Sequence, residues 1–176
     1  MNEREPAPGG LALIEALVNT VDFEAGTDTL DTPEGCARFD LAPGDVPAAR
    51  ALREALRSAL TAHAGHTAPG GPPPSELGAL LAAAPLAVTV TGDGAAALAP
   101  VPSPAPALTR RVAQAVADSL IAGTWQRLKC CESTTCRWAY YDRSPAARGR
   151  WCSMSVCGAR AKMRAYRART AARPGA

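Results

Sequence analysis

The stretch CESTTCRWAYYDRSPAARGRWCSMSVC, residues 131–157, decides how the C-terminal part of this chain folds. A pair of cysteines stands at each end of it, and four residues separate the two members of each pair. Fifteen residues lie between the pairs, which is enough chain to fold back and bring two chelating loops together. Thiolates suit Zn²⁺, which favours four ligands in a tetrahedron. The spacing predicts a zinc site made by Cys131, Cys136, Cys152 and Cys157.

The remaining two of the six cysteines are expected outside that site. Cys130 adjoins Cys131, but using it as a ligand would make the two spacings unequal, so we interpret Cys130 and Cys36 as small buried hydrophobic residues. Disulfides and an iron–sulfur cluster would use the same thiols and stay open as alternatives. Four thiolates complete the coordination of zinc and leave no position for water or substrate, so the sequence does not predict an enzyme.

The residues around the cysteines predict a small finger. Residues 138–142 are strand-like, Ser144-Pro145 starts a turn, and residues 148–151 are expected to return as the second strand. Ser153 is a plausible N-cap for a helix that follows it. A metal-bound turn, a hairpin and a metal-bound helix start predict a treble-clef-like four-cysteine zinc finger.

The charge of the chain is strongly asymmetric. Residues 1–126 hold seven Lys/Arg and fourteen Asp/Glu, which gives −7, and residues 127–176 hold twelve and two, which gives +10. A compact basic segment is typical of a part that meets a polyanion. The residues expected to contact nucleic acid lie on the last predicted helix: Arg160, Lys162, Arg164, Arg167 and Arg169.

Residues 1–126 predict a mainly helical domain with one hairpin. Helices are expected at 10–20, 47–63, 76–84 and 108–129, with the last as the longest, and a β-hairpin at 86–99. Leu52, Leu56 and Leu60 mark the buried face of the second helix, and its arginines, including Arg53 and Arg57, occupy the other face. The fold class is therefore α+β.

Several functional classes find no support in the sequence. No run of about 18 apolar residues occurs, so no membrane span is expected, and the acidic, proline-containing start does not resemble a secretory signal. These features predict a cytoplasmic protein. His63 and His66 are interpreted as two solvated loop histidines without acidic or cysteine partners.

The basic segment, residues 127–176, resembles the CGNR zinc finger family. The matching segments are residues 127–129, Cys131 to Trp138, residues 141–144, residues 150–154 and Cys157-Gly158-Ala159-Arg160, where Ala159 replaces the Asn of the family name. Residues 13–21, 50–60 and 86–98 are more loosely similar to the ABATE domain, a stress-induced transcription regulator domain that usually precedes this finger. The expected Trp within residues 24–46 is absent.

The resemblance implies three parts: an ABATE-like regulatory or dimerisation domain at 1–126, a CGNR-type zinc finger at 127–170 and a flexible tail at 171–176. It implies a zinc-dependent, DNA-binding regulator of transcription in a stress response, with a possible homodimer and a small-molecule effector bound by the first domain. Two alternatives stay open. The finger could be an adaptor that binds an acidic protein of the transcription machinery, or its thiols could form a redox switch.

Overall fold

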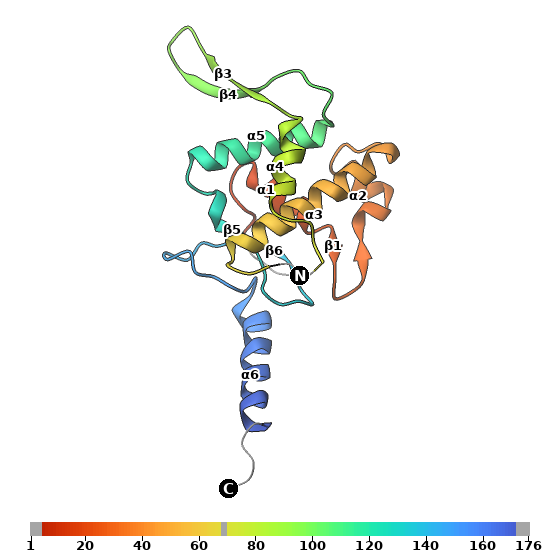
Figure 1. Ribbon diagram of the computed structural model, residues 1–176, viewed down its shortest axis with the longest axis vertical. Helices are drawn as coiled ribbons and strands as arrows, with labels where there is room; N and C mark the ends of the chain where they lie inside the picture. Colours follow the sequence, from red (N-terminus) through yellow and green to blue (C-terminus); the bar gives the residue numbers. More distant parts are fainter. Residues whose placement is uncertain (1–4, 68–69, 172–176) are drawn as a thin grey trace.

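A computed structural model describes residues 5–67 and 70–171 of the chain (Figure 1). Helices form the body, short antiparallel strand pairs flank it, and a four-cysteine unit precedes the last helix. The predicted α+β class with a zinc-finger-like C-terminal part is therefore confirmed. The helices are α1 (Leu11–Val18), α2 (Pro33–Ala37), α3 (Val46–His63), α4 (Ser75–Ala82), α5 (Ala107–Ile121) and α6 (Ala159–Ala171).

The strands of the described residues form two-stranded antiparallel sheets. The predicted hairpin is present, and Gly94 has φ +84°, the left-handed conformation that its tight turn requires. In its register Val88 lies opposite Leu98. The pairs are β1 (Val21–Asp22) with β2 (Thr27–Asp28), β3 (Leu86–Val90) with β4 (Ala96–Pro100), and β5 (Leu128–Cys130) with β6 (Ala139–Tyr141).

The main hydrophobic core surrounds α3. Leu52, Leu56 and Leu60 are buried, as their four-residue spacing predicts, and pack with apolar side chains of α1 and α5. Leu128 and Ala139, from β5 and β6, are fully buried in this same core. The strands that carry the first cysteine loop thus rest on the body formed by the preceding residues.

The expected helix at 108–129 is shorter than predicted. It ends at Ile121, where Gly123 adopts φ +65° and the N–H groups of Gly123 and Thr124 donate to the carbonyls of Leu120 and Ser119. This Schellman arrangement closes the helix. A 3-10 turn and β5 follow it, and α3 is longer than α5. The apolar residues past Gly123 therefore belong to this turn and to β5, and not to the helix.

The hairpin of the finger also differs from the prediction. β6 lies within the predicted strand at 138–142, but it pairs with β5, which precedes the first cysteine loop. Residues 148–151 form no strand. The segment 24–46, expected to be turns, additionally contains β2 and the short helix α2, which Pro33 starts and Thr32 caps.

Helix α6 projects from the body as the most distal element in Figure 1, and none of its residues is buried. Ala171 is its last residue, and the rest of the predicted tail, 172–176, lies outside the described residues. Within 5–67 and 70–171, no helix is long and apolar enough to cross a bilayer.

Candidate metal centre and nucleic-acid interface

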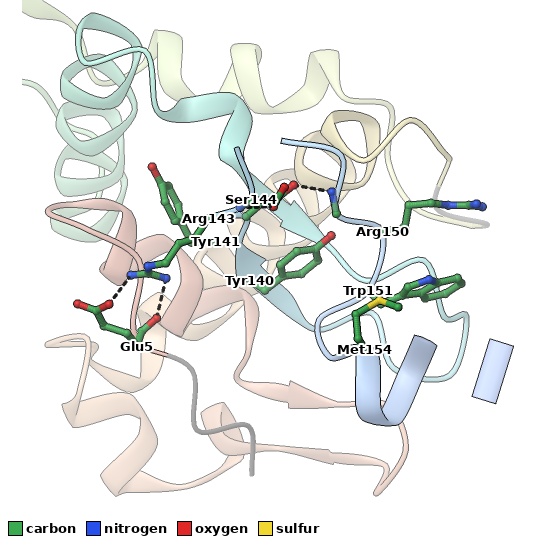
Figure 2. A pocket seen from close by; sticks show the side chains of 10 residues that line it. Glu5, Tyr140, Tyr141, Arg143, Ser144, Arg150, Trp151 and Met154 are labelled. Atoms are coloured by element: carbon green, nitrogen blue, oxygen red, sulfur yellow. Dashed lines mark hydrogen bonds and ion pairs between the residues drawn. The ribbon is translucent and has the colours of Figure 1, made fainter. Parts of the chain in front are cut away.

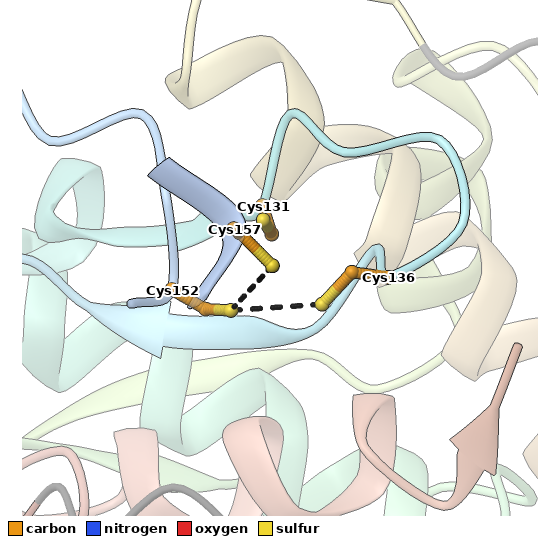
Figure 3. Close-up of side chains that lie close together, drawn as sticks. All are labelled: Cys131, Cys136, Cys152 and Cys157. Carbon is orange, nitrogen blue, oxygen red and sulfur yellow. Dashed lines mark hydrogen bonds between the residues drawn. The ribbon is translucent and has the colours of Figure 1, made fainter. Parts of the chain in front are cut away.

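Four cysteine side chains meet between two loops at the start of α6 (Figure 3). Their sulfur atoms all lie within 4.8 Å of one another. The Sγ of Cys152 lies 3.5 Å from the Sγ of Cys136 and 3.7 Å from that of Cys157. A tetrahedron with metal–sulfur bonds of about 2.3 Å places its sulfur atoms about 3.8 Å apart. The structure therefore brings the predicted ligands, completed by Cys131, into a set that can hold a metal ion.

The first loop turns sharply after Cys136. The N–H groups of Cys136 and Arg137 both donate to the carbonyl of Ser133, at 3.0 Å. Arg137 adopts φ +52°, an unusual conformation for a residue with a side chain. The N–H of Cys131 then donates to the carbonyl of Trp138 at 2.9 Å, which closes the loop. Backbone hydrogen bonds thus bring the two sulfurs of this pair together.

The second loop leads directly into the last helix. The hydroxyl of Ser153 accepts a hydrogen bond from the N–H of Val156, so the N-cap prediction for Ser153 is confirmed. Met154–Gly158 form one turn of π-helix that places Cys157 at the helix start. A Cβ on Gly158 would lie 3.1 Å from the side chain of Met154. The glycine of the CGNR-like motif therefore allows this turn to pack tightly.

The cysteine thiols of the cluster shift one another's pKa strongly. Hydrogen bonds from the thiols of Cys136 and Cys152 lower the pKa of Cys131 to about 2. The same contact with Cys131 raises the pKa of Cys136 to about 12, and it also raises the pKa of Cys152. A second thiolate at this distance would repel the first. A divalent cation removes that repulsion, so metal binding is coupled to the release of thiol protons.

The two cysteines excluded from the predicted site do lie outside it. Cys130 is buried, at 1% exposure, in the main core, where desolvation raises its pKa to about 12. The prediction that it acts as a small hydrophobic residue is confirmed. For Cys36 the prediction was wrong, because this residue is only half-buried and its thiol donates to the carbonyl of Leu30 at 3.3 Å.

Asn19, after the end of α1, anchors the finger to the body. Its side-chain amide donates to the carbonyl of Ala139 at 2.9 Å, and its Oδ1 accepts from the N–H of Ala139 at 2.7 Å. These two hydrogen bonds hold β6 against the end of α1, at a residue three positions after Cys136. The two partners are 120 residues apart, so no local sequence pattern could have indicated the contact.

Arg57 makes a second anchor, and here the sequence prediction was wrong. Arg53 and Arg57 are 6% and 2% exposed instead of facing solvent. The guanidinium of Arg57 donates to the carbonyl of Val18 at 2.6 Å and to that of Arg137 at 3.0 Å. It therefore joins α1, α3 and the first cysteine loop. A charged side chain can occupy the buried side of a helix when several hydrogen bonds satisfy it.

A buried ion pair supports the other side of the finger. Nζ of Lys129 lies 2.9 Å from Oδ2 of Asp142, and each side chain is 5% exposed. The carboxylate also accepts from the N–H groups of Ser144, at 3.0 Å, and Gly149, at 2.6 Å. Burial works to raise the pKa of Asp142, but these hydrogen bonds outweigh it and hold the pKa at about 2.

Beside this ion pair lies a cavity of about 310 Å³ at the base of α6 (Figure 2). Tyr140 stands between Tyr141 and Arg143 on one side and Trp151 and Met154 on the other. The guanidinium of Arg143 donates to backbone carbonyls of residues 5 and 6 and pairs with the carboxylate of the former. These contacts tie the N-terminal segment to the finger.

The predicted nucleic-acid residues all lie on α6 and are exposed. Arg160 pairs with Glu24, in the turn of the β1–β2 hairpin, at 2.6 Å. Arg164 and Arg167 have no acidic partner within the described chain and lie on the same side of the helix as Arg160. Lys162 and Arg169 complete the set.

The two histidines have different environments. The ring of His63 is stacked edge-on against Trp125, and its Nδ1 lies 2.9 Å from the carbonyl of Leu128. Burial lowers the pKa of His63, so the expectation of a solvated loop histidine was wrong for this residue. His66 is half-buried after the end of α3. Neither histidine belongs to the cysteine cluster.

Comparison with known families matches both parts of the chain. Residues 11–123 match the ABATE family, described as "putative stress-induced transcription regulator". Residues 127–170 match the CGNR zinc finger. No curated protein matches the chain. The two matches meet between α5 and β5, close to the place where the charge changes sign.

Proposed function

We propose, from the premise that this chain belongs to the ABATE family and carries a CGNR zinc finger, that it is a DNA-binding transcription regulator. In this proposal Zn²⁺ folds the finger and helix α6 contacts DNA. The proposed site of action is the cytoplasm, and the proposed role of the zinc is structural, because four sulfur ligands leave it no position for a substrate. A role in a stress response follows from the family description alone.

The observation that carries this proposal is that α6 is both strongly basic and exposed. The helix has five Lys and Arg residues, no Asp or Glu and no buried side chain. A helix of this length is marginal in water unless something packs on it. Its N-terminal end is held by Cys157 in the cysteine cluster, which orients the whole basic surface. A phosphate backbone would supply both the charge and the missing contact.

Binding to duplex DNA at several salt concentrations tests the helix. Arg164→Ala and Arg167→Ala should each weaken binding and lower the salt slope by about 1, as expected for lost phosphate contacts. Arg160→Ala should have a smaller effect, because Glu24 already neutralises part of its charge. Arg111→Ala is the matched control, since this exposed arginine lies on α5. Unchanged affinity in the triple α6 variant, with its metal retained, would refute the DNA proposal.

Zinc is proposed as the metal because the donor set is four thiols at tetrahedral spacing. Metal analysis of the purified protein should give one zinc per chain. Cys136→Ser or Cys152→Ser should abolish stoichiometric binding, and Cys36→Ser is the matched control because Cys36 lies outside the cluster. Full zinc content in either ligand variant would contradict the assignment.

An adaptor that binds protein is the second candidate function. Met163 and Tyr166 are 52% and 58% exposed and share one side of α6, which suits an apolar partner better than phosphates. The triple arginine variant separates the two candidates, because an apolar contact would survive it. The redox-switch alternative is less favoured, because three of the four thiols are buried.

A small-molecule effector, if the first domain binds one, has a place to enter. A cavity of about 500 Å³ lies between α1 and β6, lined by Glu15, Asn19, Arg38 and Trp138 among others. Its walls come from both family regions, and pockets often lie at such boundaries. A ligand in this cavity would contact Asn19 and could therefore alter the hydrogen bonds by which Asn19 holds the finger.

A further inference from the structure

The β3–β4 hairpin stands clear of the body, at the end of the molecule opposite to α6 (Figure 1). It is a sheet of two strands only, and such a sheet is marginally stable by itself. Val88 and Val90 on β3 are 72% and 67% exposed, which is high for large apolar side chains. The hairpin has two outer edges, one on β3 and one on β4, where a further strand could pair.

The hydrogen-bond pattern shows which backbone groups point outward. Thr91 N–H donates to Ala95 O and Val101 N–H donates to Pro85 O, at 2.9 and 3.0 Å. In an antiparallel pair, residues alternate between bonding the partner strand and pointing away from it. With the observed register, the N–H and C=O groups of Leu86, Val88 and Val90 therefore point away from β4.

The outer edge of β4 is closed, whereas that of β3 is open. On β4, the outward carbonyl of Leu98 accepts a hydrogen bond from the side chain of Gln114 at 2.9 Å, and Pro100 has no N–H to donate. On β3, no strand of the described chain pairs with the outward groups. A strand can therefore join this hairpin only along β3.

The β3 edge lacks the features that protect exposed edges from pairing. Such edges commonly carry lysine, proline or a bulge. Here the five residues of β3 contain none of these, and no charged residue occurs between positions 77 and 92. An apolar strand edge without these features is expected where another strand normally pairs with it.

The sequence of β3 is complementary to itself. We propose that β3 pairs antiparallel with β3 of a second copy of this chain, about a two-fold axis at Val88. In this register Val88 faces its own counterpart, Leu86 faces Val90 of the second copy, and Ala87 faces Thr89. Apolar residues thus meet apolar residues along one side, and no like charges are opposed. The outward groups of three residues in each copy could form up to about six hydrogen bonds.

The resulting four-stranded sheet would leave α6 uncovered, because the hairpin and α6 lie at opposite ends of the molecule (Figure 1). The dimer does not rest on DNA binding and would stand if that proposal failed. If both hold, one dimer presents two basic helices, and binding at two sites raises the overall affinity.

Register-specific cross-linking of the full, zinc-loaded chain tests the proposal. Val88→Cys places two thiols across the axis with Cα atoms about 5.5 Å apart, whereas Val90→Cys places them about 14 Å apart. A short bifunctional thiol reagent should give a covalent dimer with Val88→Cys and little with Val90→Cys. The two positions have nearly equal exposure, so Val90→Cys controls for reactivity. Both variants are made with Cys36→Ser.

Sedimentation supplies the second measurement. The wild-type chain should sediment at twice 18.1 kDa at high micromolar concentration. Val88→Pro should be monomeric, because it removes an outward N–H and no bond within the hairpin, and Val88→Thr should stay dimeric. A monomeric wild-type chain would overturn the proposal. Equal cross-linking of both cysteine variants would overturn this register and indicate contact through another surface.

Discussion

The buried pair of Lys129 and Asp142 gives the most direct test of how the finger is held together. In Asp142→Asn, the ammonium of Lys129 keeps its burial, at 5% side-chain exposure, and loses its counter-charge. Breaking a buried pair from one side costs about 3–5 kcal/mol, which is a large part of a typical unfolding free energy of about 5–15 kcal/mol. The melting temperature should fall by roughly 6–20 °C.

The matched control is Asp40→Asn. Asp40 also has a cationic partner, Arg111 at 2.9 Å, but the side chain of Asp40 is 80% exposed. Exposed pairs contribute about 0–1 kcal/mol, so this variant should be close to the wild type. Urea denaturation of both variants at pH 7 with zinc present measures the difference. Equal, small losses in the two variants would refute the reasoning, because they would show that burial adds nothing to the pair.

The same pair has a defined dependence on pH. Asp142 has a folded-state pKa of about 2, below its ordinary value, so its contribution is fully present above pH 4 and is lost as the pH falls towards 2. Between pH 8 and 5 the destabilisation by Asp142→Asn should therefore be constant. Titration of the Asp142 carboxyl group within that range, followed by carbon-detected NMR, would contradict the assignment.

Three further predictions follow from the contacts around the finger. Gly149→Ala should lower the unfolding free energy by about 1–3 kcal/mol in urea denaturation, because the new Cβ would lie 2.9 Å from the carboxylate of Asp142. Asn19→Ala should raise the rate of zinc loss to a chelator, since both hydrogen bonds to Ala139 disappear, and an unchanged rate would show that the anchor is dispensable. Removal of bound zinc with a chelator should increase amide exchange in β5 as well as in α6, because β5 pairs with β6 across the first cysteine loop.

Local patterns account for the parts that the sequence predicted well. Helix α3 follows from leucines at four-residue spacing, and the cysteine cluster follows from two equal spacings, because a chelating loop needs only neighbours in the chain. Ser153 was identifiable as a cap for the same reason. The β3–β4 hairpin combines alternating β-branched residues with a glycine-containing turn.

Long-range pairing accounts for the errors. The apolar pattern of α5 continues through Trp125 to Leu128 of β5, but the Schellman closure at Gly123 and a 3-10 turn separate the helix from the strand. Arg57 is indistinguishable by pattern from a solvated arginine, because its partners are carbonyl groups 39 and 80 residues away. Sequence periodicity reports which side of a helix is apolar. It contains no information about a distant loop that supplies hydrogen-bond acceptors to one buried charge.

These long-range contacts also decide how the two family regions depend on each other. Arg57 and Asn19 bind backbone groups one and three residues after Cys136. On the other side of the loop, Cys130 is buried in the main core directly before Cys131. Any ligand that stabilises the folded finger therefore also stabilises the contacts to α1 and α3, and the reverse holds by linkage. Metal binding, occupation of the cavity beside Asn19 and the orientation of α6 are thus expected to be energetically coupled through one short stretch of backbone.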